Sequence, residues 1–339
     1  MPSKRLGTQT IHFSDPPVIL AAASVVGRKE GDGPLRSWFD KICKDSYCGE
    51  KSWEAAESAM LAKCFTICCD KAGLAPSAVD YLFAGDLQNQ CTGSTFALRG
   101  LNIPYFGLYG ACSTMAESLS LAAMSIDGGF ADTAAAMTSS HFCSAERQYR
   151  LPLEYGGQRT PTAQWTVTGA GSVLLGKSGQ GVHITHVTTG IIHDSGIKDA
   201  ANMGAAMAPA ACETILANFR DTGRKPSDYD QIVTGDLGSV GHGILLDLLK
   251  KDGVNMNQNT ADCGMLIYDA NKQDVHAGGS GCGCSASVLC GYILGQMKRK
   301  VWNKVLFVAT GALLSPTTTL QGESIPGIAH GVVLENMGG

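Results

Sequence analysis

This sequence lacks a basic surplus and carries little charge of either sign. Its 339 residues include 26 Lys and Arg against 30 Asp and Glu, so the formal net charge is -4. A protein that binds nucleic acid electrostatically needs a surplus of cations to neutralise phosphates, so that class is excluded. Only 17% of the residues are charged and 44% are hydrophobic, which excludes an intrinsically disordered chain. The length predicts two domains or one large duplicated fold.

The sequence also lacks a long apolar run and an N-terminal apolar signal core. Two stretches, Val275 to Met297 and Val305 to Gly322, contain no Asp, Glu, Lys or Arg, but the first begins with a Gly- and Ser-rich segment. A membrane span requires about 20 predominantly apolar residues, so buried strands and helices are the favoured interpretation. The cysteines number 13, an odd count in a long chain. We expect most of them to be reduced, small buried hydrophobes rather than a disulfide framework.

What the sequence does contain is an internal repeat. Four short segments recur in the same order at spacings of 150 to 172 residues. The pairs are 81–87 (YLFAGDL) with 231–237 (QIVTGDL), 110–113 with 282–285, 132–139 with 304–311, and 169–176 with 327–334. The ordered set indicates two copies of one unit, which we place at residues 1–180 and 181–339.

Each copy alternates predicted helices with predicted strands. In the first copy, helical periodicity covers 51–73 and ends at Gly73, a strand follows at 81–84, and small apolar residues over 113–127 indicate a buried helix. In the second copy, the patterns predict helices over 207–219, 243–251 and 285–300, and strands over 231–234 and 305–309. This alternation is typical of an α/β fold with mostly parallel sheets. Two such copies predict five layers, α-β-α-β-α, with charge-poor helices buried between two sheets.

One cysteine stands at a position that favours function. Cys112 lies in the sequence Gly110-Ala-Cys-Ser-Thr114, at a sharp junction between a predicted strand and a buried helix. The start of a helix offers unpaired N–H groups and a positive partial charge, which lower the pKa of a thiol and can hold an anion. We therefore interpret Cys112 as a nucleophile or as part of an anion pocket.

A duplicated α/β chain with a cysteine at the start of a buried helix resembles the thiolase superfamily, which includes the ketoacyl synthase III condensing enzymes. Three longer runs resemble one branch of it, the stage V sporulation protein AD family. They are 152–168 (PLEYGGQRTPTAQWTVT), 274–287 (DVHAGGSGCGCSAS) and 314–330 (LSPTTTLQGESIPGIAH). The resemblance spans nearly the whole chain. It implies a thiolase-like fold and a non-enzymatic protein that binds pyridine-2,6-dicarboxylic acid (dipicolinic acid) and helps to move it, with calcium, into the developing bacterial spore.

The same resemblance implies where the protein acts and with whom. It implies a soluble chain that is peripheral at the inner membrane of the forespore or spore, with membrane channel proteins of the same sporulation system as partners. Thiolase-fold enzymes commonly form homodimers, and whether this chain does so stays open. No cofactor is implied, and the sequence contains no phosphate loop, dinucleotide fingerprint or EF-hand spacing.

The residues around Cys112 bear on whether this chain is an enzyme. Condensing enzymes of the superfamily pair the thiolate with a His and with a second His or Asn. At the matching places in the second copy this sequence has Asp236 and Ser285. An anionic Asp beside the thiol raises its pKa and cannot donate to a developing oxyanion unless it is protonated. We therefore predict that Cys112, Asp236 and Ser285 bind a ligand and that acyl transfer is disfavoured.

Two alternatives stay open at this point. One is an acyl-CoA condensing or transfer enzyme that uses Cys112 with His242 or His276 as the base; the other is a purely structural adaptor. Arg159 is a candidate partner for the ligand carboxylates. A hydrogen-bonded structural role is the favoured interpretation of the histidines near strand ends and Gly-rich turns, which are His141, His242, His276 and His330. A zinc cluster of His276, Cys282, Cys284 and Cys290 fits the usual spacing poorly.

Overall fold

The computed structural model describes residues 4–149, 159–256 and 259–337. Two sheets of five main strands form its framework, and their strand orders mirror each other. The strands run β12-β11-β14-β15-β10 in one half and β3-β9-β7-β5-β6 in the other. A single antiparallel residue pair, Val18 of β3 with His183 of β10, joins the two halves. The mirrored order is that of a duplicated fold.

The first copy contributes the following elements. Its strands are β3 (Val18–Val26), β5 (Tyr81–Gly85), β6 (Tyr105–Leu108), β7 (Thr133–Ser140) and β9 (Gly169–Gly176), and its helices are α2 (Trp53–Ala72), α3 (Thr92–Leu98), α4 (Thr114–Asp127) and α5 (Phe142–Tyr149). Short elements complete it: β1 (Arg5–Leu6), β2 (Thr10–His12), α1 (Arg28–Gly31), β4 (Lys41–Ile42) and β8 (Trp165–Thr166). Strands β5, β6 and β7 are parallel, and β9 is antiparallel to both β7 and β3.

The second copy repeats this plan. Its strands are β10 (Gly181–Thr188), β11 (Gln231–Thr234), β12 (Thr260–Asp262), β14 (Lys304–Ala312) and β15 (Gly327–Met337). Its helices are α6 (Met203–Thr222), α7 (Gly238–Lys251), α8 (Cys263–Leu266), α9 (Cys282–Val288), α10 (Leu294–Lys298) and α11 (Pro316–Leu320), and β13 (Gly279–Ser280) pairs with β8. A π-helical turn over Leu289–Ile293 joins α9 to α10.

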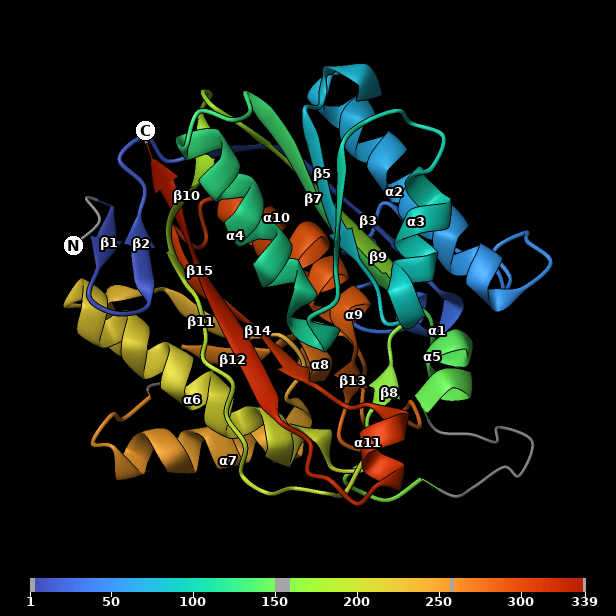
Figure 1. Ribbon diagram of the computed structural model, residues 1–339, viewed down its shortest axis with the longest axis vertical. Helices are drawn as coiled ribbons and strands as arrows, with labels where there is room; N and C mark the ends of the chain where they lie inside the picture. The colour runs from blue at the N-terminus through green and yellow to red at the C-terminus, as the bar shows by residue number, and fades with distance from the viewer. Residues whose placement is uncertain (1–3, 150–158, 257–258, 338–339) are drawn as a thin grey trace.

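The layers follow the expected order. Figure 1 shows α2 and α3 on the outer side of one sheet, α6 and α7 on the outer side of the other, and α4 with α9 and α10 between the sheets. The central helices are almost entirely buried; α4 and α9 face apolar side chains from both halves in one continuous core. The small residues of the central helices permit this close approach, because a Cβ on Gly171 of β9 would lie 2.6 Å from the backbone of Ala286.

The repeat predicted from the sequence is confirmed by the places of its members. The two Gly-Asp-Leu segments end β5 and β11, each the second strand from its edge of the sheet, and β7 corresponds to β14 as β9 does to β15. The predicted strand 231–234 has the observed bounds. The helix predicted over 51–73 is α2, and Gly73 follows it in the left-handed conformation (φ 66°). The division at residues 180 and 181 stays a prediction.

Three helices of the second copy differ from the predicted bounds. Helix α6 extends over Met203–Thr222 rather than 207–219, and α7 begins at Gly238 rather than 243. The helix predicted over 285–300 begins earlier, at Cys282, and changes to π geometry in its middle. Each helix starts earlier than predicted over a segment that contains Gly, namely 203–206 (MGAA), 238–242 (GSVGH) and 282–284 (CGC). Gly is a weak helix former, and such short segments have no clear periodicity to signal the boundary. No helix in the described ranges is long and apolar enough to cross a membrane.

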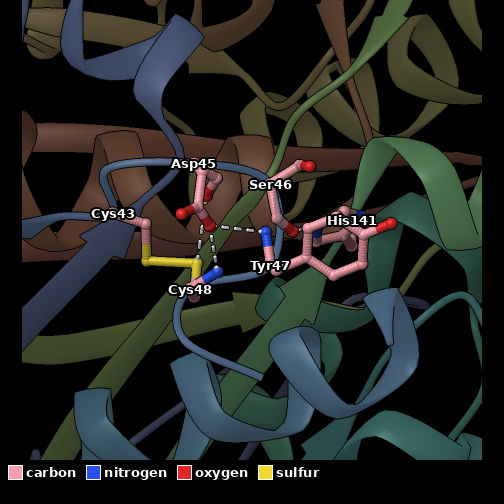
Figure 2. Close-up of a disulfide and its surroundings, with 6 residues drawn as sticks. All are labelled: Cys43, Asp45, Ser46, Tyr47, Cys48 and His141. Carbon is pink, nitrogen blue, oxygen red and sulfur yellow. Dashed lines mark hydrogen bonds between the residues drawn. A yellow bond between two sulfur atoms is a disulfide. The ribbon is translucent and has the colours of Figure 1, made fainter. Parts of the chain in front are cut away.

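Most of the cysteines are free, as the sequence predicts, but one pair forms a disulfide. Cys43 and Cys48 form a disulfide in the loop after β4, with their Cα atoms 5.2 Å apart (Figure 2). The other eleven cysteines are free, and all except Cys143 are buried, as expected for small apolar side chains. The spacing of this pair did not predict a bond, because two cysteines five residues apart can form a disulfide only where the loop folds back on itself.

Candidate functional site

Cys112 lies on a tight 3₁₀ turn, Ala111–Ser113, that leads directly into α4. The hydroxyl of Ser113 donates to the carbonyl of Gly110 at 2.7 Å, and the hydroxyl of Thr114 donates to the carbonyl of Ala111 at 2.7 Å. Both carbonyl groups also accept backbone N–H bonds, from Ser113 and Thr114, so the turn that carries Cys112 is held by backbone and side-chain bonds together. Its exposed fraction is 6%, so the thiol is nearly removed from solvent.

Asp236 of the second copy reaches the Cys112 thiol, as the sequence predicts. The Asp236 carboxylate lies beside that thiol and accepts two hydrogen bonds, from the Gly281 N–H (2.8 Å) and the Thr310 hydroxyl (2.8 Å). Burial raises the pKa of Asp236 to about 7. Burial and the Asp236 charge raise the pKa of Cys112 well above its usual value. At neutral pH the site therefore contains a thiol, opposed by a carboxyl group that is partly protonated.

Ser285 occupies the place expected for the third member but points elsewhere. Its hydroxyl donates to the carbonyl of Cys282 at 3.2 Å, within the first turn of α9. The residue is fully buried and packs close to Gly235, one residue before Asp236. Ser285 thus lies behind Asp236 rather than on the surface of the cavity described next.

A cavity of about 50 Å³ lies beside Cys112. Apolar side chains make most of its wall, and Glu146, Tyr149, Thr166 and Ser280 add polar atoms. The described residues that line it are Leu87, Ala111, Cys112, Ala145, Glu146, Tyr149, Thr166, Met203, Ser280, Ala312 and Leu314. Known small-molecule pockets measure roughly 300–1,000 Å³, so this cavity has to enlarge before it holds a ligand.

One wall of the cavity comes from α5, a helix in which no site residue was expected. Ala145, Glu146 and Tyr149 lie on one face of this helix, at spacings of one, three and four residues. The adjoining wall comes from Thr166 and Ser280, which are adjacent across the parallel pair β8–β13, and the Thr166 hydroxyl donates to Glu146 of α5 at 3.5 Å. A Gly-rich segment around Ser280 marked this region in the sequence, but nothing in the sequence indicated Glu146 or Tyr149.

Arg159 and the histidines lie outside this cavity. Arg159 forms an ion pair with Asp274 (2.6 Å) and covers the ring of Trp165, and His276 pairs with the same Asp274 at 3.1 Å. Burial lowers the pKa of His242 on α7, and the nearby Asp262 opposes that change. Among the described residues that line the cavity beside Cys112, neither His242 nor His276 is present, and Arg159 is not among them either.

The other two candidate histidines, His141 and His330, are hydrogen-bonded. The three thiols of the zinc alternative each donate to a different backbone carbonyl group. The ring of His141 contacts the carbonyl of Ser46 at 2.7 Å, and His330 accepts from the Gly190 N–H at 3.1 Å. The Sγ atoms of Cys282, Cys284 and Cys290 donate to the carbonyls of Ser139, Gly235 and Ser172, respectively. Within the described ranges, no group of three or more His, Cys, Asp and Glu side chains is arranged to hold a metal ion.

Comparison with solved structures identifies the fold. The chain resembles 3-oxoacyl-[acyl-carrier-protein] synthase III from Aquifex aeolicus, with a TM-score of 0.57 and 12% identity over 94% of this chain and 99% of that one. A variant of OleA from Xanthomonas campestris gives a TM-score of 0.60 and 12% identity over 96% and 99%. At such identities the likeness shows a thiolase-like fold and nothing about activity.

Comparison of the sequence identifies the branch. The family model for stage V sporulation protein AD matches residues 7–335. The stage V sporulation protein AD of Bacillus subtilis is 47% identical over 336 residues, which is 99% of each chain. The three runs that carried the resemblance lie within the matched range. The chain is a thiolase-fold member of the stage V sporulation protein AD family.

Proposed function

We propose that this sporulation protein binds dipicolinic acid as its calcium chelate in the cavity beside Cys112 and that it does not catalyse acyl transfer. The observation that carries the proposal is that the buried Cys112 thiol has the buried Asp236 carboxyl group as its neighbour. A condensing enzyme needs a thiolate at this place, and a neighbouring carboxylate opposes its formation. The site therefore favours holding a ligand over reacting with it.

The surroundings of Cys112 also lack the groups that acyl transfer uses. A developing oxyanion requires donors directed at it, and a general base must lie within hydrogen-bond reach of the proton that it takes. None of the described residues that line the cavity is a histidine. His276 is held by Asp274, and His242 lies near Asp262. The condensing-enzyme alternative therefore rests on the fold alone.

The charge of the cavity favours the chelate over the bare dianion. Glu146 lines the wall and Asp236 lies beside Cys112, whereas no Lys or Arg occurs among the described residues that line the cavity. Two carboxylates repel a dicarboxylate ligand in a poorly solvated site. Calcium prefers oxygen ligands and cancels the two ligand charges, so the chelate enters as a neutral molecule. Thr166 and Ser280 then offer hydroxyl groups to its carboxylate oxygens.

Calorimetry with purified protein tests this proposal. We expect saturable binding of calcium dipicolinate, weaker binding of dipicolinate in the presence of a chelator, and a loss of roughly tenfold or more in Cys112→Ala and Asp236→Ala. Ser285→Ala measures the contribution of the third predicted residue, and Ser287→Ala is the matched control. The Ser287 hydroxyl bonds within the same helix to Gly283 and lines no part of the cavity. Absence of binding, or equal binding by all variants, contradicts the proposal.

A second measurement addresses the enzyme alternative. The protein is incubated with an acyl-CoA, and its intact mass is recorded. We expect no stable adduct, because the Cys112 thiol is not ionised at neutral pH. An acyl adduct that is absent in Cys112→Ala favours the condensing enzyme instead.

The cellular setting is also part of the proposal. We propose that the protein acts peripherally at the inner membrane of the forespore, with membrane channel proteins of the same sporulation system as its partners. The membership in a sporulation family and the absence of a spanning helix in the described ranges support a peripheral place. Flotation with vesicles that contain the channel proteins, compared with empty vesicles, tests it: binding to neither kind contradicts the proposal.

A further inference from the structure

The disulfide closes a short loop on the surface of the first copy. This Cys43–Cys48 loop (residues 43–48) follows β4, and the carboxylate of Asp45 accepts hydrogen bonds from the N–H groups of Tyr47 and Cys48, both at 2.9 Å (Figure 2). The residues between the two cysteines are exposed, whereas Cys43 is buried. The disulfide and the Asp45 bonds together hold the loop in one shape, and Cys48 lies on its more accessible side.

His141 connects this loop to α5. One ring nitrogen, Nε2, contacts the carbonyl of Ser46 at 2.7 Å, and Figure 2 shows the ring directed at the loop. The other nitrogen, Nδ1, accepts from the N–H of Cys143 at 3.2 Å, so the ring proton lies on Nε2 and is donated to Ser46. His141 is fully buried and directly precedes α5. It therefore links the loop to the first turn of that helix.

A second connection reaches the far end of α5. The ring of Tyr47 stacks on that of Trp53 with centroids 5.9 Å apart, and the guanidinium of Arg147 lies 5.4 Å from the Trp53 ring centroid. Arg147 also forms an ion pair with Glu54. Position 147 faces away from the helix face of Ala145, Glu146 and Tyr149. The loop thus supports α5 from behind, while the front of the helix forms the cavity wall.

We propose that the Cys43–Cys48 disulfide is a redox-sensitive support that holds α5 against the Cys112 cavity, and that its reduction lets α5 move outward and enlarge the cavity. The cavity of about 50 Å³ has to enlarge before it holds a ligand, and the intact support opposes that enlargement. Without the disulfide, the loop gains conformational freedom, and the contacts of Ser46 and Tyr47 with α5 lose their fixed partners. The effect on ligand affinity rests on the proposed function; the movement of α5 does not.

The chemical step is reduction by a dithiol. A thiolate of the dithiol attacks Cys48 Sγ, forms a mixed disulfide, and releases Cys43 as a thiolate that takes up a proton. The second thiol of the reductant then displaces Cys48, which is protonated in turn. The protein gains two electrons and two protons as the disulfide becomes two thiols. The dithiol is oxidised to its own disulfide.

Hydrogen exchange measured by mass spectrometry tests the support directly. The full chain is compared in its oxidised form, after reduction with dithiothreitol, and as Cys43→Ser/Cys48→Ser. We expect amides of residues 142–149 to exchange roughly tenfold faster in the second and third samples. His141→Leu, which keeps the disulfide but removes the link to Ser46, should reproduce part of this increase. Cys143→Ser is the matched control, because it removes a free thiol beside His141 and leaves the disulfide intact.

Two results would overturn the inference. One is equal exchange of residues 142–149 in the oxidised and reduced proteins. The other is titration of all 13 cysteines as free thiols in protein prepared without reductant. Affinity for calcium dipicolinate, measured in both redox states, separates the two proposals: we expect tighter binding after reduction, by roughly tenfold. Absence of binding in both states counts against the proposed function alone. If the amides of residues 142–149 exchange faster after reduction but the ligand affinity is equal in the two redox states, the proposal that the disulfide controls the cavity is overturned.

Discussion

The two Gly-Asp-Leu turns of the repeat have the same place in their sheets but use their aspartates differently. In the first copy, Asp86 is fully buried and bonds only to its own loop, accepting from the N–H of Gln88 (2.9 Å) and from the N–H and hydroxyl of Ser94 (both 2.7 Å). In the second copy, Asp236 has distant partners in sequence, Gly281, Thr310 and Cys112.

A second aspartate explains how the second copy tolerates this change. Asp262, at the end of β12, accepts from the N–H groups of Leu237 (2.8 Å) and Gly238 (3.0 Å), which follow Asp236 directly. It also accepts from the Met265 N–H and the Thr234 hydroxyl. Asp262 therefore stabilises the turn in the second copy as Asp86 does in the first. Because Asp262 takes this local role, Asp236 is available to lie beside Cys112.

The largest expected effect that tests this division of roles among Asp86, Asp236 and Asp262 is a change in the free energy of unfolding. We expect Asp262→Ala to lower the free energy of unfolding by about 3–5 kcal/mol, because it leaves several buried N–H groups without partners. Asp86→Ala should behave similarly. Asp236→Ala should cost about 1–3 kcal/mol, since one buried backbone N–H, that of Gly281, loses its partner. Urea unfolding at neutral pH measures all three. If Asp236→Ala is the most damaging, the division of roles between the two aspartates is wrong.

The pH dependence of stability sharpens the comparison at Asp236 itself. Its folded pKa of about 7 lies above the unfolded value, so the folded state binds this proton more tightly than the unfolded state. The contribution of Asp236 is therefore largest in acid and is lost as the pH rises to about 7. We expect the stability gap between the natural protein and Asp236→Asn to shrink by on the order of 2–4 kcal/mol between about pH 4 and pH 8.

Urea unfolding of the two proteins across this range measures the gap. Comparing the variant with the natural protein cancels the other buried acids whose pKa is raised, among them Glu30, Glu57 and Asp262. A gap that stays constant with pH would mean that the Asp236 proton is not linked to folding.

The resemblance and the repeat together explain why the sequence predicted Asp236 beside Cys112 but not the wall of the cavity. The catalytic pattern of condensing enzymes pointed to the residues after the strand 231–234, and equivalent strand ends in a duplicated fold converge on one region. The wall of α5 has no such signal: Glu146 and Tyr149 belong to an ordinary amphipathic segment, and only the tertiary packing brings them to Cys112. Ser285 has the predicted location, but its rotamer, which the sequence does not encode locally, directs the hydroxyl into its own helix.

The edge strands of the two copies differ, and this difference bears on how two molecules of this protein form a dimer. The edge strand of the first copy is β6, where Phe106 is 52% exposed, and the surrounding segment 101–116 contains no charged residue. The edge strand of the second copy, β12, is three residues long, none of its residues is exposed, and Asp262 at its end is buried. An exposed, uncharged edge is the one that can pair with another strand. We therefore expect the chain to dimerise through β6.

Charge placed on each edge tests this expectation. Phe106→Glu should weaken the dimer by roughly tenfold or more, and Thr260→Glu on β12 should leave it unchanged. Light scattering coupled to size-exclusion chromatography over a range of concentrations measures both. A monomeric natural protein, or equal effects of the two variants, would contradict the assignment of the dimer to the first copy.

The smallest expected effect concerns the equivalent cysteines, Cys112 and Cys284. Burial raises the pKa of both thiols well above the usual value, and the Asp236 charge adds to this in each case. Alkylation by iodoacetamide should therefore be slow at neutral pH for both and should accelerate only as the pH rises beyond about 9. Mass mapping of the alkylated peptides follows each thiol separately. A Cys112 rate that reaches its plateau near pH 7, with Cys284 still unreactive, would reveal a thiolate of the kind a condensing enzyme needs. It would show that the two copies differ in reactivity as well as in the use of their aspartates.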